Sequence, residues 1–252
     1  MTHVSIVTGA SRGIGKAIVD TILQTPEAKV VAIARSQYAL QSLKDKYGPD
    51  SFDFVAGDVT DVITVQKAID VALTQFGQID SIVANAGVLD PVGAINTTSI
   101  DDWKKLYDVN LFSIVQLIQL SLPELKRTKG NIVAVSSGAA NKAYSGWYAY
   151  GSSKAALNHL IFSLAQEEPL IQAISIAPGV VDTEMQQDIR EKFGSNMSKE
   201  GLQRFIDLHE KKQLVPPEEP GRVFANLALK GWSADLNGQF LRYNDSKLES
   251  YK

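Results

Sequence analysis

Short apolar runs alternate along this chain with longer segments of helical pattern. Continuous apolar runs indicate strands that are buried on both faces of a parallel sheet. The predicted strands are Val4–Thr8, Lys29–Ala34, Phe52–Ala56, Ser81–Ala84, Asn131–Ser136, Gln172–Ala177 and Gly238–Tyr243. The predicted helices are Ile14–Gln24, Ala39–Tyr47, Val62–Phe76, Ile100–Lys126, Tyr150–Gln166 and Glu218–Leu229. This order predicts an α/β fold with a doubly wound, seven-stranded parallel sheet and helices on both faces.

The 252 residues show no break in composition, no linker and no internal repeat, so we expect one domain over residues 1–252. One segment departs from the alternation. Residues Asp182–Pro217 are polar and helical in pattern, have no predicted strand, and directly follow a strand end. We expect them to form a lid over that edge of the sheet. The last residues, Asp245–Lys252, are polar and are expected to be loosely held.

Composition excludes several classes of function. Hydrophobic residues make up 44% and charged residues 21%, which is typical of a soluble globular protein, and the net charge of -3 offers nucleic acid no overall attraction. The absence of cysteine excludes disulfides and thiolate sites, and His3, His159 and His209 are not at metal-ligand spacing, so no metal is expected. We recognise no targeting segment, and the apolar stretch Leu111–Leu125 is too short and too polar to cross a membrane. A cytoplasmic protein is therefore expected.

The first predicted strand runs into a turn that contains Gly9, Gly13 and Gly15. Glycine lets the backbone approach a phosphate closely, and the N-terminus of the following helix attracts its negative charge. Glycine-rich turns also serve purely structural purposes, but this one lies between a strand and a helix, where nucleotide binding requires it. The turn therefore predicts a nucleotide site.

The end of the second predicted strand bears on which nucleotide binds. An enzyme that uses NAD places a carboxylate there to bind the ribose hydroxyls, whereas this chain has Ala34, Arg35 and Ser36. Arginine pairs well with a 2′-phosphate, and Arg12 in the glycine turn could reach the same group. Both arginines could also be ordinary surface residues. Their positions, together with the missing acid, favour NADP(H).

A tyrosine and a lysine four residues apart, Tyr150 and Lys154, would share one face of a helix. A nearby cation favours tyrosinate and lowers the pKa of the tyrosine, which eases proton exchange with an alkoxide near neutral pH. Such pairs are common by chance on helix surfaces. Here, however, a predicted strand also ends in Ser136 and Ser137 at the carboxyl edge of the sheet, where open α/β sheets bind ligands.

Together the run Thr8–Gly15, the triplet Asn85-Ala86-Gly87 and the Tyr150/Lys154 pair resemble the single-domain short-chain dehydrogenases/reductases, and the resemblance extends from about Ser5 to Asp245. It implies a Rossmann-type fold, association into a homodimer or homotetramer, and four catalytic residues. These residues are Ser137, Tyr150, Lys154 and Asn110.

In this resemblance Tyr150 donates the proton and Ser137, 13 residues before it, holds the carbonyl oxygen of a small-molecule substrate. Ser136 is expected to satisfy backbone at the strand end. Asn110 would hold a water that links Lys154 to solvent, the alternative being a capping or solvated asparagine. Asp58 would hold the adenine amino group, the alternative being a turn or capping aspartate. The implied cofactor-binding residues are Gly9, Ser11, Arg12, Gly13, Ile14, Gly15, Arg35, Ser36, Asp58, Val59, Asn85, Ala86, Gly87, Tyr150, Lys154, Pro178, Gly179, Val181 and Thr183.

Substrate choice is expected to depend on the segments after Ser137 and after Thr183. Their apolar and aromatic members suit a bulky, flat carbonyl compound, although they could equally be ordinary packing or a subunit contact. The candidate pocket residues are Ala139, Tyr144, Trp147 and Met185.

Within the family the chain is most similar to sepiapterin reductases and to the related benzil reductases, through Leu164–Pro169, Pro178–Met185 and Asn237–Asp245. Sepiapterin reductases anchor the pterin with an acid where this chain has Arg242. The expected activity is therefore NADPH-dependent reduction of ketones or diketones of the benzil or α-keto ester kind, with a pterin reductase as the alternative. A non-catalytic NADPH-sensing regulator, or an epimerase or dehydratase, would use the same fold. The latter two usually need a larger substrate domain than the residues after Thr183 can build.

Overall fold

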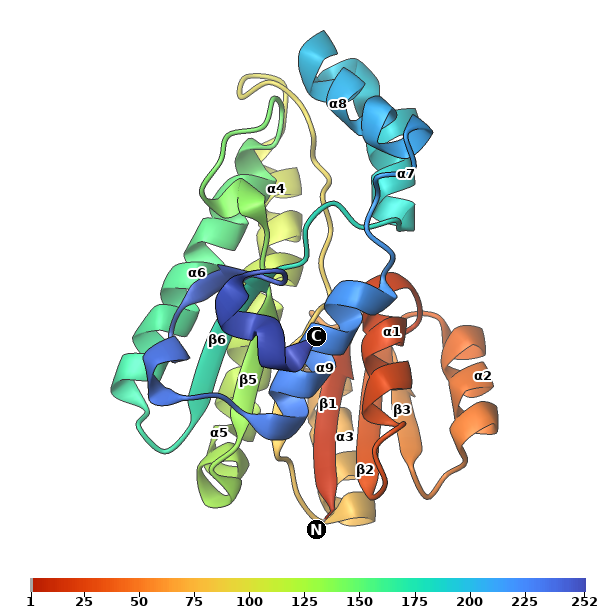
Figure 1. Cartoon of the computed structure of the whole chain (residues 1–252), viewed down its shortest axis with the longest axis vertical. Coiled ribbons are helices and arrows are strands. Elements are labelled where there is room, and N and C mark those ends of the chain that lie inside the picture. Colours follow the sequence, from red (N-terminus) through yellow and green to blue (C-terminus); the bar gives the residue numbers. More distant parts are fainter. Residues whose placement is uncertain (1) are drawn as a thin grey trace.

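The computed structural model describes residues 2–252, in which seven strands form one parallel sheet (Figure 1). The strands are β1 (His3–Thr8), β2 (Ala28–Ala34), β3 (Phe52–Ala56), β4 (Ser81–Ala84), β5 (Asn131–Val135), β6 (Gln172–Ala177) and β7 (Phe240–Arg242). Their order across the sheet is β3-β2-β1-β4-β5-β6-β7. The predicted doubly wound sheet is confirmed. Strand β7 is shorter than predicted because Gly238, at a φ of 76°, still belongs to the turn that leads into it.

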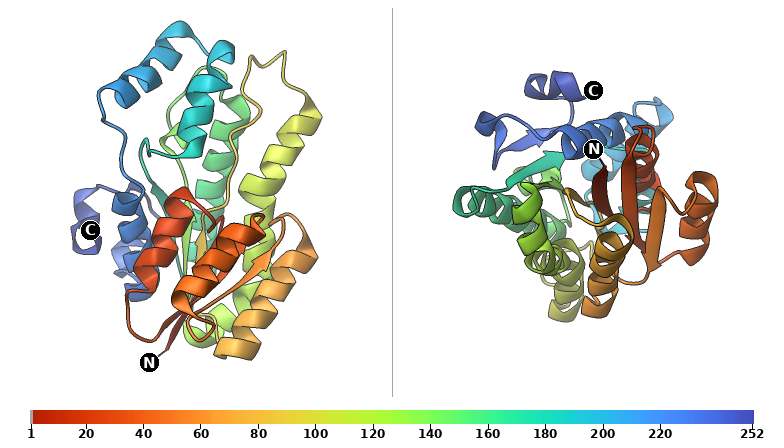
Figure 2. Two further views of the ribbon diagram at one scale, coloured as in Figure 1. Left: turned by 90° about the vertical axis from the view of Figure 1, so that its right-hand side faces the viewer. Right: turned by 90° about the horizontal axis from the view of Figure 1, so that it is seen from below.

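Helices cover both faces of this sheet (Figure 2). One apolar layer contains α1 (Gly13–Ile22), α2 (Gln37–Tyr47) and α9 (Glu218–Lys230). The other contains α3 (Val62–Val71), α5 (Ser113–Thr128) and α6 (Tyr148–Glu167). Successive strand residues such as Val30 and Val31 belong to opposite layers, as the two-residue repeat of a strand requires. No helix among residues 2–252 is long and apolar enough to cross a membrane.

The helical stretch predicted over Ile100–Lys126 is interrupted. Helix α4 (Ile100–Tyr107) runs into a π-helical turn, η2 (Asp108–Phe112), before α5 begins. A second π-helical turn, η1 (Ala72–Phe76), extends α3. Turns of this kind occur mostly as single bulges and often lie at functional sites. In η2 the bulge holds Asn110 against the loop after β4.

Above the carboxyl edge of the sheet lie α7 (Glu184–Glu191), the short 3-10 turn η4 (Gly194–Asn196) and α8 (Lys199–Glu210), at the top of Figure 1. The segment is helical, as predicted, but it is not free of β-pairing, because Val215 forms an isolated bridge with Val181. Main-chain bonds of 2.9 Å from Asp182 to Val215 and from Val215 to Val180 close the two ends of the segment together. Short 3-10 turns η3 (Gly138–Ala140) and η5 (Ala234–Leu236) complete the connections.

The prediction of a loosely held C-terminus is wrong. Residues Ser246–Tyr251 form a 3-10 helix, η6, and Leu248 is fully buried in the layer that contains α9. The hydroxyl of Tyr251 donates to the carbonyl of Gly231 at 2.9 Å, and the side chain of Asn226 donates to the carbonyl of Tyr251 at 2.9 Å. One apolar side chain and these two hydrogen bonds hold a segment whose polar composition predicts mobility.

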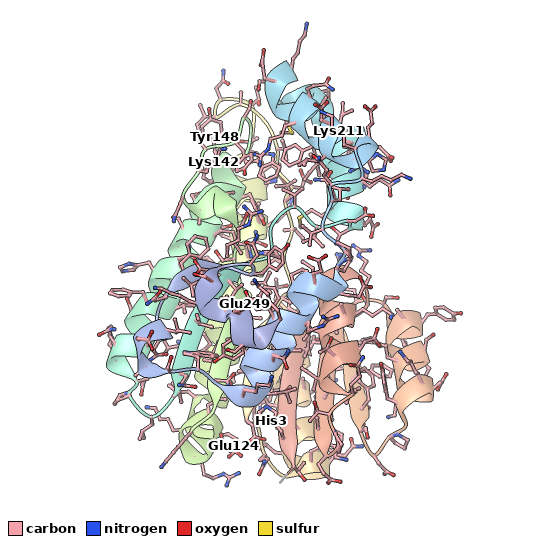
Figure 3. All side chains as sticks on the ribbon, in the orientation of Figure 1. His3, Glu124, Lys142, Tyr148, Lys211 and Glu249 are labelled. Carbon is pink, nitrogen blue, oxygen red and sulfur yellow. The ribbon has the colours of Figure 1, made fainter. Side chains whose placement is uncertain are left out.

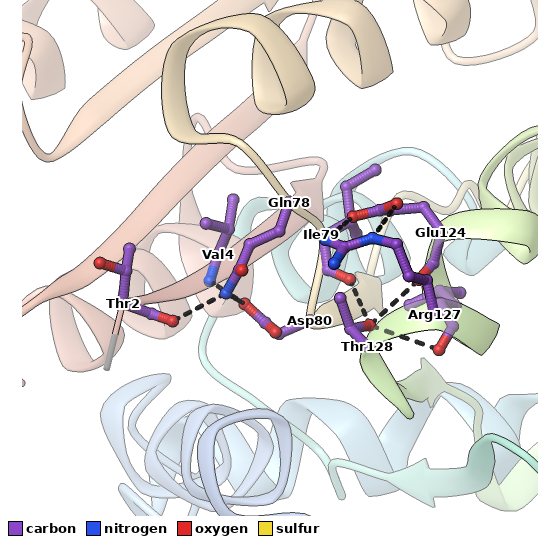
Figure 4. Close-up of polar contacts among 9 residues, drawn as sticks. Thr2, Val4, Gln78, Ile79, Asp80, Glu124, Arg127 and Thr128 are labelled. Carbon is purple, nitrogen blue, oxygen red and sulfur yellow. Dashed lines mark hydrogen bonds and ion pairs between the residues drawn. The ribbon is translucent and has the colours of Figure 1, made fainter.

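Polar side chains close the amino edge of the sheet. Asp80 accepts from the main chain of Val4 at 2.7 Å and from Gln78 at 2.8 Å, and Gln78 also donates to the carbonyl of Thr2 (Figure 4). Nearby, Thr128 donates to the carbonyl of Ile79 at 2.8 Å. Figure 3 shows His3 and Glu124 at this lower end, and Lys142, Tyr148 and Lys211 at the opposite end. These hydrogen bonds tie the strand ends together at the amino edge of the sheet.

Candidate active site

A cavity of about 600 Å³ opens at the carboxyl edge, between the α1 turn and α6. Strand order reverses between β1 and β4 at this edge, which is where open α/β sheets bind ligands. Of the implied cofactor-binding residues, all except Gly179 and Val181 line this cavity, and those two line a neighbouring one. The structure thus brings together residues that the sequence separates by more than 170 positions, from Gly9 to Thr183.

The glycine turn between β1 and α1 brings backbone segments close together. Gly9 has a φ of 66°, and a Cβ on Gly15 would lie 2.2 Å from the carbonyl oxygen of Gly9, so neither position accepts a side chain without a shift. The side chain of Asn85 donates to the carbonyls of Thr8 and Gly9 at 3.0 and 3.1 Å. Asn85 therefore fixes the turn from the β4 side. The first turn of α1 contains no acidic residue, so its N-terminal dipole is free to attract an anion such as a pyrophosphate.

At the far end of this cavity Ala34 ends β2, and Arg35 is exposed beside it. Ser36 caps α2 by accepting a 3.4 Å hydrogen bond from the main chain of Ala39. None of these residues supplies the carboxylate that binds the ribose in NAD enzymes. This arrangement fits a phosphorylated ribose. Arg12 is engaged elsewhere, because it forms an ion pair with Glu184 in the first turn of α7.

Asp58 follows β3 and lines the same end of the cavity. Its carboxylate accepts bonds of 2.9 and 2.8 Å from the main chain and hydroxyl of Thr60. Asp58 therefore does stabilise a turn, which is the alternative given for it in the sequence analysis. An adenine contact would use the acceptor capacity that these two bonds leave.

Helix α6 presents Tyr150 and Lys154 one turn apart, and both side chains are buried, with 8% and 3% exposed. The Nζ of Lys154 lies 5.9 Å from the centre of the Tyr150 ring and donates to the carbonyl of Val135 at 2.9 Å. Lys154 thus connects the tyrosine helix to the end of β5.

The two groups have shifted pKa values. Burial raises the pKa of Tyr150, the nearby Tyr144 adds to this, and a polar contact with Ser137 lowers it. Burial also lowers the pKa of Lys154 to about 8. The prediction that the lysine lowers the pKa of the tyrosine is therefore wrong for the protein alone, because desolvation penalises both charged forms. The shift favours a neutral phenol, which is the form that donates a proton.

The two serines after β5 have different partners. Ser137 caps the short turn η3, accepting from the main chain of Ala139 at 3.1 Å, and it lines the second cavity. Ser136 instead contacts the side chain of Asn158 on α6 at 2.6 Å. The prediction that the Ser136 side chain satisfies backbone is therefore wrong, because its partner is the side chain of Asn158. Its engagement with α6 leaves Ser137 as the hydroxyl beside Tyr150.

Asn110 is fully buried, so the solvated alternative is wrong. Its amide pairs with both main-chain groups of Val88 at 2.8 Å and donates to the hydroxyl of Ser153 at 3.2 Å. Gly87 lies between Asn110 and Lys154: a Cβ there would be 3.4 Å from the Asn110 Oδ1 and 3.5 Å from the Lys154 Nζ. The site keeps a side-chain-free position between these two polar groups.

A second cavity of about 160 Å³ adjoins the first and shares Tyr150 with it. Of the predicted pocket residues, Tyr144, Trp147 and Met185 line it. Ala139 lines neither cavity and instead belongs to the apolar cluster behind them, so its assignment is corrected. The cavity is also lined by Ile189, Arg204 and Phe205, which the sequence does not predict because α7 and α8 carry no motif. Isolated apolar positions in this polar segment are the signal that could indicate buried contacts there.

No group of three or more histidine, aspartate and glutamate side chains within the described part of the chain could hold a metal ion. The chemistry available at the junction of the cavities comes from two hydroxyls and an ammonium group. Ser137 and Tyr150 can both hydrogen bond to one substrate oxygen, and Lys154 can exchange a proton with solvent or with a neighbour.

Comparison with known proteins identifies the family. The family model for short chain dehydrogenases matches residues 3–194. The uncharacterized oxidoreductase YIR035C of Saccharomyces cerevisiae is 51% identical, over 100% of this chain and 99% of its own length. The benzil reductase ((S)-benzoin forming) IRC24 of the same yeast is 47% identical, over 98% of each chain.

Solved structures agree with these matches. The crystal structure of YIR035C has a TM-score of 0.97 at 50% identity and covers 99% of both chains. A yeast structure described as a cytoplasmic protein with unknown function has a TM-score of 0.85 at 49% identity and also covers 99% of both. Since the family model spans most of the chain and full-length relatives share about half of its residues, the chain belongs to the short chain dehydrogenases and is an oxidoreductase acting on CH–OH and C=O groups.

Proposed function

We propose that this protein is an NADPH-dependent carbonyl reductase that reduces aromatic ketones and diketones. The observation that carries the proposal is that Tyr150 lines both cavities, so a substrate in the smaller one would meet a proton donor at the border of the larger one. The 47% identity to a benzil reductase supports the diketone class. Aromatic side chains on the wall of the smaller cavity suit a flat ring.

In this mechanism the hydroxyls of Ser137 and Tyr150 hold the carbonyl oxygen and stabilise the negative charge that grows on it. A reduced nicotinamide, when bound, supplies the hydride that forms the new C–H bond and is itself oxidised. The π bond of the carbonyl breaks toward oxygen, and Tyr150 gives that oxygen its proton. Lys154, with a pKa of about 8, returns a proton to the tyrosine, and Asn110 keeps a path to solvent beside Gly87.

The preference for NADPH follows from the end of β2. Arg35 beside the cavity offers a planar guanidinium that pairs with a 2′-phosphate. No carboxylate is present there to accept hydrogen bonds from the ribose hydroxyls of NADH. Arg12 supports the phosphate less directly, since it is paired with Glu184.

Further proposals concern the setting of the site. Residues 182–217 would act as a lid that excludes water, within a single domain over residues 1–252. Exposed aromatic side chains, Phe112 and Phe162, support burial between subunits of a homodimer or homotetramer. A cytoplasmic location is proposed from the relative that is described so.

Two alternatives have weaker support. A pterin reductase needs an acid to pair with the donor groups of the pterin, whereas Arg242 lines the smaller cavity. A non-catalytic NADPH sensor would have no need of the complete set Ser137, Tyr150, Lys154 and Asn110. Tight NADPH binding without turnover of any ketone would favour the sensor.

The test is oxidation of NADPH and of NADH with benzil, an α-keto ester and sepiapterin. Tyr150→Phe should lower kcat by about 10²- to 10⁴-fold with little change in NADPH affinity, because only the hydroxyl that donates the proton is removed and the ring is kept. Tyr148→Phe is the matched control on the same helix, since that side chain is 52% exposed and lines neither cavity. Equal loss in both variants, or full activity of Tyr150→Phe, would contradict the proposal.

A further inference from the structure

Two arginines line the smaller cavity, Arg204 from α8 and Arg242 from the end of β7. The described part of its lining includes no aspartate or glutamate. Neither guanidinium forms an ion pair with any carboxylate within residues 2–252. The cavity therefore carries two positive charges that the protein itself does not neutralise.

Arg204 is exposed and lies against two aromatic rings. It donates to the hydroxyl of Tyr144 at 3.2 Å, and its guanidinium lies 5.5 Å from the centre of that ring and 5.9 Å from the ring of Phe205. A guanidinium has five N–H donors, so this single bond leaves most of them for a ligand. The stacking orients the group without satisfying its charge.

The guanidinium of Arg242 lies close to the backbone of Gly179. A Cβ on Gly179 would lie 3.3 Å from the Nη2 of Arg242, and Gly179 has a φ of 83° that disfavours any other residue. The guanidinium is thus placed against the loop that follows β6, where Pro178 and Gly179 border the cavity. The positive charge of Arg242 therefore lies on the wall of the smaller cavity.

The wall of the cavity beside Arg204 is aromatic. Trp147 stacks on Tyr144 at 4.9 Å and on Phe205 at 5.5 Å, and it meets the ring of Tyr150 edge-on at 5.6 Å. A volume of about 160 Å³ is close to that of a cavity that takes one benzene ring. One aryl group would fill this part, and the rest of the substrate would extend past the catalytic hydroxyls.

We propose that the preferred substrates are aryl ketones that carry a carboxylate, that is, aromatic keto acids. This inference rests on the proposed carbonyl reductase function. The ring lies against the aromatic wall, the ketone oxygen accepts from Ser137 and Tyr150, and the carboxylate pairs with Arg242 and Arg204. Hydride from the reduced nicotinamide and a proton from Tyr150 convert the ketone to a hydroxy acid, while the carboxylate takes no part in the reaction.

The experiment compares kcat/KM with NADPH for two keto acids and their methyl esters: benzoylformate and 3-benzoylpropionate, which differ in the distance from ketone to carboxylate. Benzil serves as an uncharged substrate. The quantity of interest is the acid-to-ester ratio of kcat/KM, measured in the wild type, Arg242→Met, Arg204→Met and Arg242→Lys. Arg127→Met is the matched control, because Arg127 pairs with Glu124 at the opposite edge of the sheet (Figure 4).

For at least one pair, the wild type should prefer the acid, and Arg242→Met should lower the acid-to-ester ratio by about tenfold or more, the effect of one lost charge-assisted contact. Arg242→Lys should recover part of the ratio, and Arg127→Met should leave it at the wild-type value. An unchanged ratio in Arg242→Met and Arg204→Met, with esters and benzil still reduced, would overturn this inference alone. If neither benzil nor any ester is reduced, the proposed function itself fails.

A binding measurement separates recognition from turnover. Benzoate should inhibit reduction of the methyl ester more strongly than benzamide, its uncharged counterpart, and the difference should shrink in Arg242→Met and with rising salt. Equal inhibition by the two compounds in the wild type would contradict an anion-binding cavity. This comparison stays informative even where a variant reduces ketones slowly.

Discussion

The ammonium of Lys154 donates a 2.9 Å hydrogen bond to the carbonyl of Val135, the last residue of β5. This bond ties α6, the helix that carries Tyr150, to the strand that leads into Ser137. It also satisfies only one of the three donors of a buried cation. Several properties of the site follow from the cost of that charge.

The first prediction concerns stability and pH. The pKa of Lys154 is lowered from 10.5 to about 8, so between these values the unfolded chain binds more protons than the folded one. The free energy of unfolding should therefore rise as the pH increases from about 8 toward 10.5. Lys154→Met should be more stable than the wild type near neutral pH, by about 1–3 kcal/mol, and almost inactive.

Denaturant unfolding over this pH range measures both effects. Lys67→Met is the matched control, because Lys67 is exposed on α3. A methionine variant less stable than the wild type at neutral pH would mean that the bond to Val135 outweighs the desolvation of the charge.

Gly87→Ala should separate catalysis from folding. Its Cβ would make contacts of 3.4 and 3.5 Å with Asn110 and Lys154, which are ordinary packing distances. The methyl group would nevertheless occupy the space through which we propose that Lys154 reaches solvent. We expect an unchanged Tm and a fall in kcat of about tenfold or more.

Asn110→Ala is the comparison, since it leaves both main-chain groups of Val88 unpaired and should lower stability by about 1–3 kcal/mol as well as kcat. Thermal melts, steady-state kinetics and NADPH titration provide the readouts. If Gly87→Ala weakens NADPH binding as much as it lowers kcat, the methyl group acts on the cofactor and the proton path is not supported.

Arg35→Ala should reduce the preference for NADPH over NADH. Loss of one charge-assisted contact with a phosphate is worth about tenfold or more in kcat/KM for NADPH, with little effect on NADH. Arg12→Ala should have a smaller effect, because Arg12 is paired with Glu184. Arg222→Ala, on α9 and outside both cavities, is the control. A preference that survives Arg35→Ala would assign the phosphate to another group.

His3 should make the fold sensitive to acid. Burial lowers its pKa below 6.5, and Asp80 opposes the shift only in part. Its contribution to stability is therefore complete above about pH 6.5 and is lost as the pH falls toward the lower folded pKa. His3→Asn, which is polar and does not titrate in this range, should show a flatter decline in Tm below that pH. His209→Asn on α8 should decline as the wild type does, and identical curves for all three proteins would exclude His3 as the cause.

Much of the sheet is predictable because its signal is local. The strands from β1 to β6 are mostly apolar runs, nearly all of them buried apart from the edge strand β3, and their bounds match the predictions within one residue. The C-terminal helix η6 escapes such reasoning, since buried Leu248 and the hydrogen bonds of Tyr251 anchor it to residues outside the tail. The polar composition of that tail says nothing about these contacts, which decide its structure.

The candidate site likewise has a part that the sequence predicts and a part that it does not. The residues around Gly9 and Tyr150 lie in spaced motifs, so the sequence predicts which residues gather at one edge. The wall formed by Arg204 and Phe205 lies on α8, and only the path of the chain between α7 and α9 brings it over Tyr144. The shifted pKa values of Tyr150 and Lys154 were also beyond the sequence, because they depend on how deeply both groups are buried.

The π-helical turn Asp108–Phe112 holds one residue more than an ordinary helical turn would. Deleting a single residue from it would restore a regular helix from Ile100 to Thr128, and local propensity alone would favour that change. Every side chain before the deletion would then turn by about 100° relative to α5. The two hydrogen bonds between the Asn110 side chain and the main chain of Val88 could not survive such a rotation. In a comparison of related chains, a length change within these five residues would therefore mark loss of the proposed reaction, even where Ser137, Tyr150 and Lys154 are retained.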